Sequence, residues 1–125
     1  MFLAIDFSSE IPIYEQIRRE IIKALAQGEL EFGQSLPSVR QLGSDIGVNL
    51  HTVNKAYKLL EEDGIITMDR RYGSRIVDET LEINTRQEEK IAEELEFITA
   101  LAKVKGLGKD EFLGDVDKLW EKYDE

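Results

Sequence analysis

The chain has 125 residues, 16 of them basic and 26 acidic, and its formal net charge is −10. This length suits one ordinary domain, or a small domain with a helical appendage. The absence of cysteine excludes disulfide scaffolds, thiol catalysis and cysteine-ligated metal sites. No apolar run reaches the length of a membrane span and the amino terminus lacks a signal-peptide pattern, so we expect a folded cytoplasmic protein.

The negative charge is unevenly distributed along the chain. Residues 1–78 have a net charge of −3, whereas residues 79–125 have a net charge of −7. Residues 34–60 have a net charge of +2, from Arg40, Lys55 and Lys58 against Asp45. An anion-binding face is therefore expected in this segment or among the arginines at positions 70, 71 and 75.

Three helices are predicted in the first half of the chain. The first begins near Pro12, which suits a first helical turn, and its apolar residues recur at four-residue spacing until Gly28 ends it. The second follows Ser38, a good N-cap, and stops at Gly47. The third follows another cap, Asn49, and extends to about residue 63.

Two β-prone runs follow the third helix, at residues 65–68 and 74–77. The residues between them, 69–73, include two arginines, a tyrosine and a glycine, and are typical of a hairpin loop. The predicted order is three helices and then a hairpin. We therefore predict an α+β fold that is mostly α.

After residue 78 the composition changes, and two amphipathic helices are predicted on either side of Gly106-Leu107-Gly108. The first of them carries two apolar stripes about 100° apart, and the second carries an aromatic stripe. Two helices alone cannot bury so much apolar surface, so residues 79–125 are predicted to form a homodimer. The predicted dimerisation residues are Ile91, Leu95, Phe97, Ile98, Leu101, Val104, Phe112, Val116, Leu119, Trp120 and Tyr123.

The segment from residue 42 to residue 56 has the steric pattern of a helix-turn-helix. Gly43 is small enough for the second helix to cross close to the third, and Gly47 suits a left-handed turn. The apolar residues of the segment fill the wedge between the two helices. The pattern predicts that the third helix is a recognition helix.

An ordered set of motifs extends over residues 11–78: Ile11-Pro12-Ile13-Tyr14-Glu15-Gln16-Ile17, Gly28-Glu29-Leu30, Gly33, Leu36-Pro37-Ser38-Val39-Arg40, and Asn54-Lys55-Ala56-Tyr57 with Leu60-Glu61 and Gly64. Together these motifs resemble the winged-helix domain of GntR-type bacterial transcription regulators. The remaining 47 residues are too few for the large effector domains of most GntR subfamilies. They resemble the two-helix dimerisation tail of the small YtrA-like subfamily.

The resemblance implies a winged helix-turn-helix DNA-binding domain in residues 1–78 and a two-helix dimerisation region in residues 79–125. It implies a transcription regulator that binds double-stranded DNA at a palindromic operator, as a dimeric repressor of an operon for an ABC-type transporter. No cofactor is expected. Whether a small-molecule effector also binds is left open, because no residue identifies one.

The predicted DNA contacts follow from helix-turn-helix geometry and from the resemblance. The amino-terminal residues of the recognition helix meet base edges and its later lysines meet phosphates. Ser38 and Arg40 match residues of the family that contact the backbone and groove. The predicted DNA-binding residues are Ser38, Arg40, Asn49, His51, Thr52, Asn54, Lys55, Lys58, Arg70, Arg71 and Gly73.

The sequence departs from the family pattern at two places. Many members carry arginine at the positions of Leu50 and Asn54, so their base preference does not transfer to this chain. In the wing, Arg71 stands where the first of two glycines is usual, which leaves the geometry of the wing open.

Two other classes of function compete with a DNA-binding regulator. The net charge favours a protein-binding adaptor that uses its winged helix as an interaction surface without DNA, and a gel shift at low salt separates the two. An enzyme is disfavoured, because a single histidine and no cysteine leave only carboxylates as catalytic groups. A histidine-rich metal site is excluded for the same reason, and no metal site is predicted.

Overall fold

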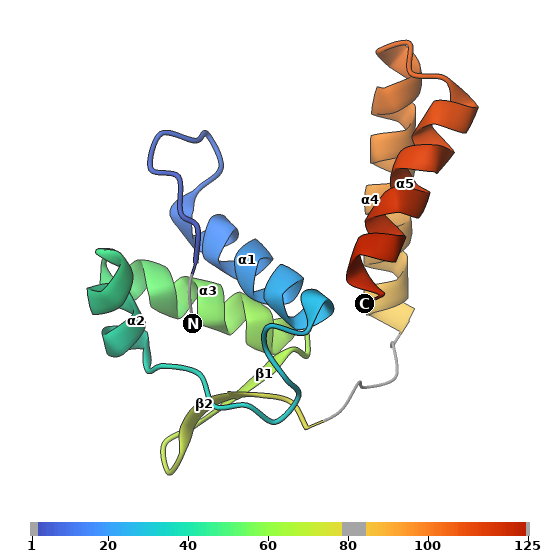
Figure 1. Cartoon of the computed structure of the whole chain (residues 1–125). Coiled ribbons are helices and arrows are strands. Elements are labelled where there is room, and N and C mark those ends of the chain that lie inside the picture. The colour runs from blue at the N-terminus through green and yellow to red at the C-terminus, as the bar shows by residue number, and fades with distance from the viewer. Residues whose placement is uncertain (1–2, 79–84, 125) are drawn as a thin grey trace. The chain divides into compact units, whose positions relative to one another are not determined.

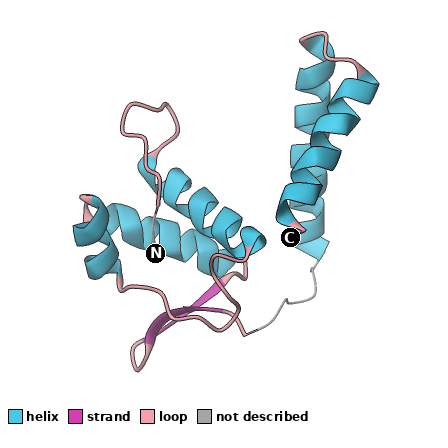
Figure 2. Cartoon of the chain, in the orientation of Figure 1, coloured by secondary structure: helices cyan, strands magenta, loops and turns pink. Residues whose placement is uncertain are grey.

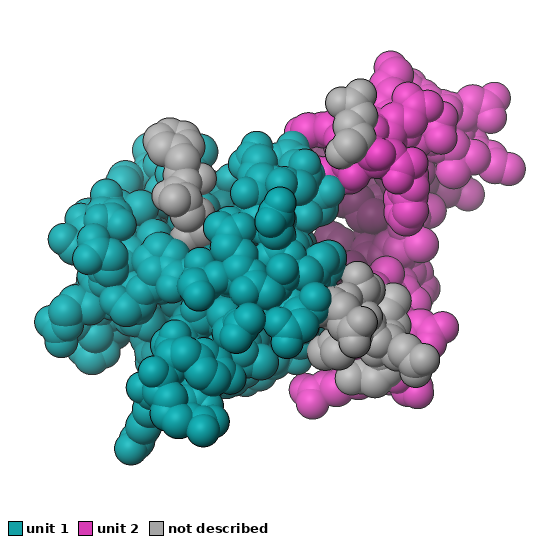
Figure 3. Space-filling model, turned by 60° about the horizontal axis from the view of Figure 1, so that its bottom comes forward, with its two compact units in different colours: residues 1–81 teal, residues 82–125 magenta. Residues whose placement is uncertain are grey.

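The computed structural model describes residues 3–78 and 85–124, which divide into two compact units (Figure 1). The first unit spans residues 1–81 and the second spans residues 82–125, coloured separately in Figure 3. The predicted domain boundary after residue 78 adjoins residues 79–84, which lie outside the described residues. That boundary therefore stays a prediction.

The first unit contains three helices and a hairpin, in the predicted order (Figure 2). The helices are α1 (Ile13–Gln27), α2 (Val39–Ile46) and α3 (Leu50–Glu62). The strands are β1 (Ile66–Asp69) and β2 (Gly73–Ile76). The second unit contains α4 (Thr85–Val104) and α5 (Lys109–Tyr123). The predicted fold class, α+β and mostly α, is confirmed.

The hydrophobic core of the first unit lies between the three helices and the hairpin. α3 occupies its centre, because one face of this helix is fully buried against α1 and α2. Burial of each large apolar side chain contributes roughly 1.5–3 kcal/mol. The largest buried side chains come from every element of the unit: Ile17, Ile21, Leu42, Val53, Tyr57, Leu60, Ile66 and Ile76.

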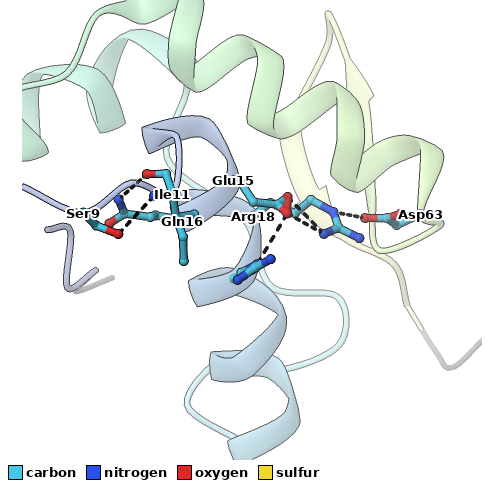
Figure 4. A network of polar contacts seen from close by, with 7 residues as sticks. Ser9, Ile11, Glu15, Gln16, Arg18 and Asp63 are labelled. Carbon is cyan, nitrogen blue, oxygen red and sulfur yellow. Dashed lines mark hydrogen bonds and ion pairs between the residues drawn. The ribbon is translucent and has the colours of Figure 1, made fainter. Parts of the chain in front are cut away.

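Polar contacts join α1 to the segment before it and to the end of α3 (Figure 4). The buried Gln16 donates from Nε2 to the carbonyl oxygens of Asp6 and Ile11, at 2.9 and 2.8 Å, and its Oε1 accepts from the Asp6 N–H at 2.8 Å. Arg18 donates to Asp63 at 2.7 Å and to Glu15 at 3.1 Å, and the hydrogen bond to Asp63 raises the pKa of Arg18. The segment before α1 and the end of α3 are thereby tied to the same helix.

The strands β1 and β2 pair in antiparallel register, with Ile66 opposite Ile76 and Asp69 opposite Gly73. The segment before α2 also pairs with β2, which the sequence did not predict. The Ile76 N–H donates to the Gln34 carbonyl at 2.8 Å and the Leu36 N–H donates to the Ser74 carbonyl at 2.9 Å. These bonds join backbone atoms only, and residues 34–36 are too few to show the alternation of apolar side chains that predicts a strand.

Two glycines shape the turn between α2 and α3, as predicted. Gly47 has φ +69°, a left-handed conformation that favours glycine. A Cβ at Gly43 would lie 2.7 Å from the carbonyl oxygen of Val48. The Val48 N–H donates to the Gly43 carbonyl at 2.8 Å, so the backbone of the turn lies directly against α2.

The second unit differs from the first in its packing. None of the described residues of α4 or α5 is buried, although both helices carry large apolar side chains. The exposed fraction is 40% for Leu101, 71% for Trp120 and 83% for Val104. Among the described residues, no helix has the length and apolar composition that a membrane crossing requires.

We expect Gly43→Ala to destabilise the first unit by about 1–3 kcal/mol, because the added methyl group meets backbone that cannot move aside easily. Gly114→Ala in α5 is the matched control, since a Cβ there meets no atom within 4 Å. The control should be as stable as the unaltered protein or more stable. Hydrogen exchange of the α3 and α5 amides measures both effects. Unchanged protection of α3 in Gly43→Ala would contradict the close approach.

Candidate nucleic-acid interface

The helix-turn-helix consists of α2, α3 and the turn at Gly47. The buried face of α3 turns Val53, Ala56 and other apolar residues toward the core. At its amino-terminal end Asn49, Leu50 and His51 are exposed, whereas Thr52 and Asn54 are half-buried. The predicted readers therefore lie at the start of α3, on the part of the helix that the core leaves open.

Asn49 caps α3 through its side chain. Its Oδ1 accepts a hydrogen bond from the His51 N–H at 2.7 Å, which confirms the predicted N-cap. The same oxygen is one of the two atoms that a bidentate contact to adenine requires. The Nδ2 amide remains the donor that Asn49 can offer to a base edge or a phosphate.

Ser38 caps α2 in the same way, and this cap was also predicted. Its Oγ accepts from the Gln41 N–H at 3.0 Å. The carbonyl of the preceding Pro37 accepts a hydrogen bond from the Tyr57 hydroxyl at 2.8 Å, and burial raises the pKa of that hydroxyl. Tyr57 is a core residue, and its hydroxyl additionally fixes the start of α2 against α3. Arg40, the second residue of α2, is exposed.

The wing consists of β1, β2 and the loop Arg70-Arg71-Tyr72 between them. Gly73 follows the loop with φ +79°, the conformation that a three-residue hairpin loop needs at its end. Positive φ angles occur only at glycines among residues 3–78 and 85–124, so Arg71 is not in a left-handed conformation. The wing therefore forms without the glycine that is usual at this position.

A shallow hollow of about 270 Å³ lies between the start of α2 and the wing. It brings together side chains that are far apart in the sequence, including Ser38, Asp69 and Arg70. One predicted contact from the helix-turn-helix, Ser38, and two from the wing, Arg70 and Gly73, therefore line the same hollow. Polar groups at its edge, such as the Ser38 hydroxyl and the Arg70 guanidinium, are of the kinds that contact a nucleic-acid backbone.

The cations of the candidate interface differ in their surroundings. Lys58 is exposed on α3, whereas the Nζ of Lys55 lies 4.0 Å from the centre of the Tyr14 ring on α1. In the wing, Arg71 pairs with Asp69 at 3.2 Å, and Arg75 pairs with Asp78 at 3.2 Å.

Asp69 was not among the predicted site residues. Its carboxylate accepts a hydrogen bond from the Arg71 N–H at 2.7 Å, and the hydrogen bonds from Arg71 lower the pKa of Asp69. The signal in the sequence is an aspartate two residues before the residue it bonds, the spacing of an Asx turn. Within the described part of the chain, no group of three or more acidic, histidine or cysteine side chains could hold a metal ion.

The model of the family described as "Bacterial regulatory proteins, gntR family" matches residues 13–76. The chain belongs to the GntR family. It is 45% identical over 74 residues to the HTH-type transcriptional repressor YtrA of Bacillus subtilis, which is 59% of this chain and 57% of YtrA. It is 32% identical over 115 residues to YhcF, an uncharacterized HTH-type transcriptional regulator of the same organism, which is 92% of this chain and 95% of YhcF.

Solved structures agree with this assignment. A structure described as a transcriptional antiterminator from Listeria monocytogenes EGD-e has a TM-score of 0.88 and 28% identity, over 95% of this chain and 90% of that chain. The DNA-binding domain of AraR, solved in complex with operator ORX1, has a TM-score of 0.55 and 26% identity, over 62% of this chain and 99% of that domain. The predicted winged-helix fold and resemblance to YtrA-like regulators are confirmed. The chain is a DNA-binding transcription regulator and not an enzyme.

We expect the two functions of Asn49 to separate in two variants. Asn49→Ala removes the acceptor for the His51 N–H and should lower the free energy of unfolding by about 1 kcal/mol. Asn49→Asp keeps an acceptor there and suits the positive end of the helix dipole, so it should be as stable as the unaltered protein. Its added negative charge should nevertheless weaken DNA binding. Urea unfolding and fluorescence anisotropy measure the two effects, and unchanged affinity of Asn49→Asp would place the start of α3 away from DNA.

Proposed function

We propose that this chain is a dimeric, sequence-specific repressor that acts at a palindromic operator and controls an operon for an ABC-type transporter. The observation that carries the proposal is the exposed amino-terminal end of α3, with polar side chains at the positions where recognition helices read bases. Repression is supported by the name of YtrA, and the transporter operon by the resemblance to YtrA-like regulators. A cytoplasmic location accompanies this activity. Family membership favours it over a protein-binding adaptor.

The proposed base readers are Asn49, His51, Thr52 and Asn54. They occupy the first turns of α3, and each can offer a hydrogen-bonding group to the edge of a base. Lys58 lies farther along the helix and is exposed, which suits a phosphate contact. We also assign Ser38, Arg40 and the wing residues Arg70, Arg71 and Gly73 to the DNA interface, with Lys55 beside them.

The proposed dimer forms through α4 and α5. The two helices leave an open groove of about 720 Å³, lined largely by apolar side chains such as Leu95, Phe112 and Val116. Isolated helices of this length are marginal in water, so the exposed apolar surface requires a cover. A second copy supplies a matching apolar surface. Burial of a few side chains at roughly 1.5–3 kcal/mol each offsets an association cost of about 4–15 kcal/mol.

Two-fold symmetry would determine the form of the operator. In a symmetric dimer the two recognition helices face equivalent half-sites, and a palindromic sequence follows. Half-sites on one face of the duplex lie about one helical turn, roughly 34 Å, apart.

The test of base reading compares four variants by selection from random duplexes. Thr52→Ala and Asn54→Ala should change the preferred sequence, because each removes a group that contacts base edges. Lys58→Ala should leave the preferred sequence unchanged and lower the dependence of log affinity on log salt by about one unit, because it removes one phosphate contact. Arg40→Ala should weaken binding by about 1–3 kcal/mol without unfolding the protein. The same preferred sequence for all four proteins would show that the readers lie elsewhere.

The test of the dimer uses Leu101→Glu in the full chain. Leu101 is 40% exposed, so the isolated unit tolerates the change, whereas an apolar dimer interface does not. The variant should sediment as a monomer at concentrations where the unaltered protein is a dimer, and it should bind a palindromic duplex more weakly. Lys118→Glu introduces the same residue on the polar face of α5 and should stay dimeric. A monomeric unaltered protein would contradict the proposal.

A further inference from the structure

The wing contains a carboxylate among the cations that face nucleic acid in the proposed function. Asp69 ends β1 and lines the hollow between the wing and the start of α2, together with Ser38, Arg70 and Gly73. Its side chain is 25% exposed. A negative charge at a surface that binds phosphates opposes that binding.

Asp69 forms a bidentate ion pair with Arg71 of the wing. Oδ1 accepts from the backbone N–H of Arg71 at 2.7 Å and from its Nε at 3.2 Å, while Oδ2 accepts from Nη2 at 3.2 Å. Both carboxylate oxygens therefore face the same guanidinium, the geometry in which arginine binds carboxylates most specifically. The Arg71 side chain is 85% exposed, so DNA can reach it and compete with Asp69.

The three wing arginines differ in whether their charges are paired with carboxylates. Arg75 pairs with Asp78 and also donates to the carbonyl of Gly33 at 3.2 Å, which ties it to the body of the unit. Arg70 has no ion-pair partner within 4.0 Å among the residues that the structure describes. Release of Arg71 would therefore give the tip of the wing a second uncompensated arginine beside Arg70.

We infer that Asp69 is an internal counter-ion that limits the affinity of the wing for DNA by holding Arg71. This inference rests on the proposed placement of Arg71 at the DNA interface. A phosphate and Asp69 compete for the same guanidinium, and every complex that uses Arg71 must first separate the pair. Because the electrostatic part of DNA binding does not depend on sequence, the effect of Asp69 extends to all duplexes.

The test uses the full chain and a fluorescein-labelled duplex of mixed sequence, titrated by anisotropy over a series of salt concentrations. In Asp69→Asn the amide oxygen still accepts from the Arg71 N–H, so the turn is kept while the ion pair is lost. We expect this variant to bind about two- to fivefold more tightly at low salt, the range that corresponds to loss of an exposed ion pair. The slope of log affinity against log salt should steepen by less than one unit, because Arg71 already makes part of its phosphate contact in the unaltered protein.

Three further proteins complete the experiment. Asp78→Asn removes the same charge from the other arginine pair and should change affinity less than Asp69→Asn, because Arg75 keeps its bond to Gly33. Arg71→Ala should bind more weakly and with a shallower salt slope. The double variant Asp69→Asn with Arg71→Ala should bind like Arg71→Ala alone, since the gain depends on the freed guanidinium. Thermal unfolding confirms that all four variants are folded.

The outcomes separate the inference from the proposed function. If Arg71→Ala weakens binding while Asp69→Asn leaves affinity and slope unchanged, Arg71 contacts DNA and the inference is wrong. If the double variant exceeds Arg71→Ala by the full gain of Asp69→Asn, the carboxylate acts by repulsion alone, and the counter-ion assignment is overturned. If Arg71→Ala changes nothing, the proposed DNA contact of Arg71 fails and the inference fails with it.

Discussion

At Gly43 the backbone of α2 lies so close to the turn after it that a Cβ would be 2.7 Å from the Val48 carbonyl oxygen. This approach sets the angle at which α3 leaves the turn, and Gly47 completes the turn in a left-handed conformation. The Tyr57 hydroxyl then joins α3 back to the residue before the α2 cap. The position of the start of α3 depends on these contacts, because a wider crossing angle would move α3 away from α2.

The local features of the fold could be predicted from the sequence, because they depend on residues close in the chain. The caps at Ser38 and Asn49 and the glycines of the turn are of this kind. The pairing of residues 34–36 with β2 could not be predicted, since it joins backbone atoms some forty residues apart. The ion pair of Arg71 was also not predicted, because the Asx-turn spacing of Asp69 predicts a bond to the Arg71 backbone N–H and does not specify the position of the guanidinium.

The two units bury their apolar side chains to different degrees. The first closes a core around α3, in which Tyr57 and Leu60 are fully buried. The second leaves the apolar residues of α4 and α5 exposed, and the stripes that the sequence predicted on these helices meet no core within the described residues. The sequence could indicate that these faces need a partner, whereas the identity of the partner depends on a surface beyond one chain.

The pairing of residues 34–36 with β2 affects the conformational entropy that the wing loses when it binds a ligand. A two-stranded hairpin is marginally stable by itself in water, and its tip would sample many orientations. The third backbone segment joins the hairpin to the chain that enters α2, so the wing and the start of α2 hold a fixed mutual orientation before any ligand arrives. Surfaces ordered in advance lose less conformational entropy on association. In the proposed DNA interface the wing is therefore a preorganised element, and no folding step reduces its contribution to affinity.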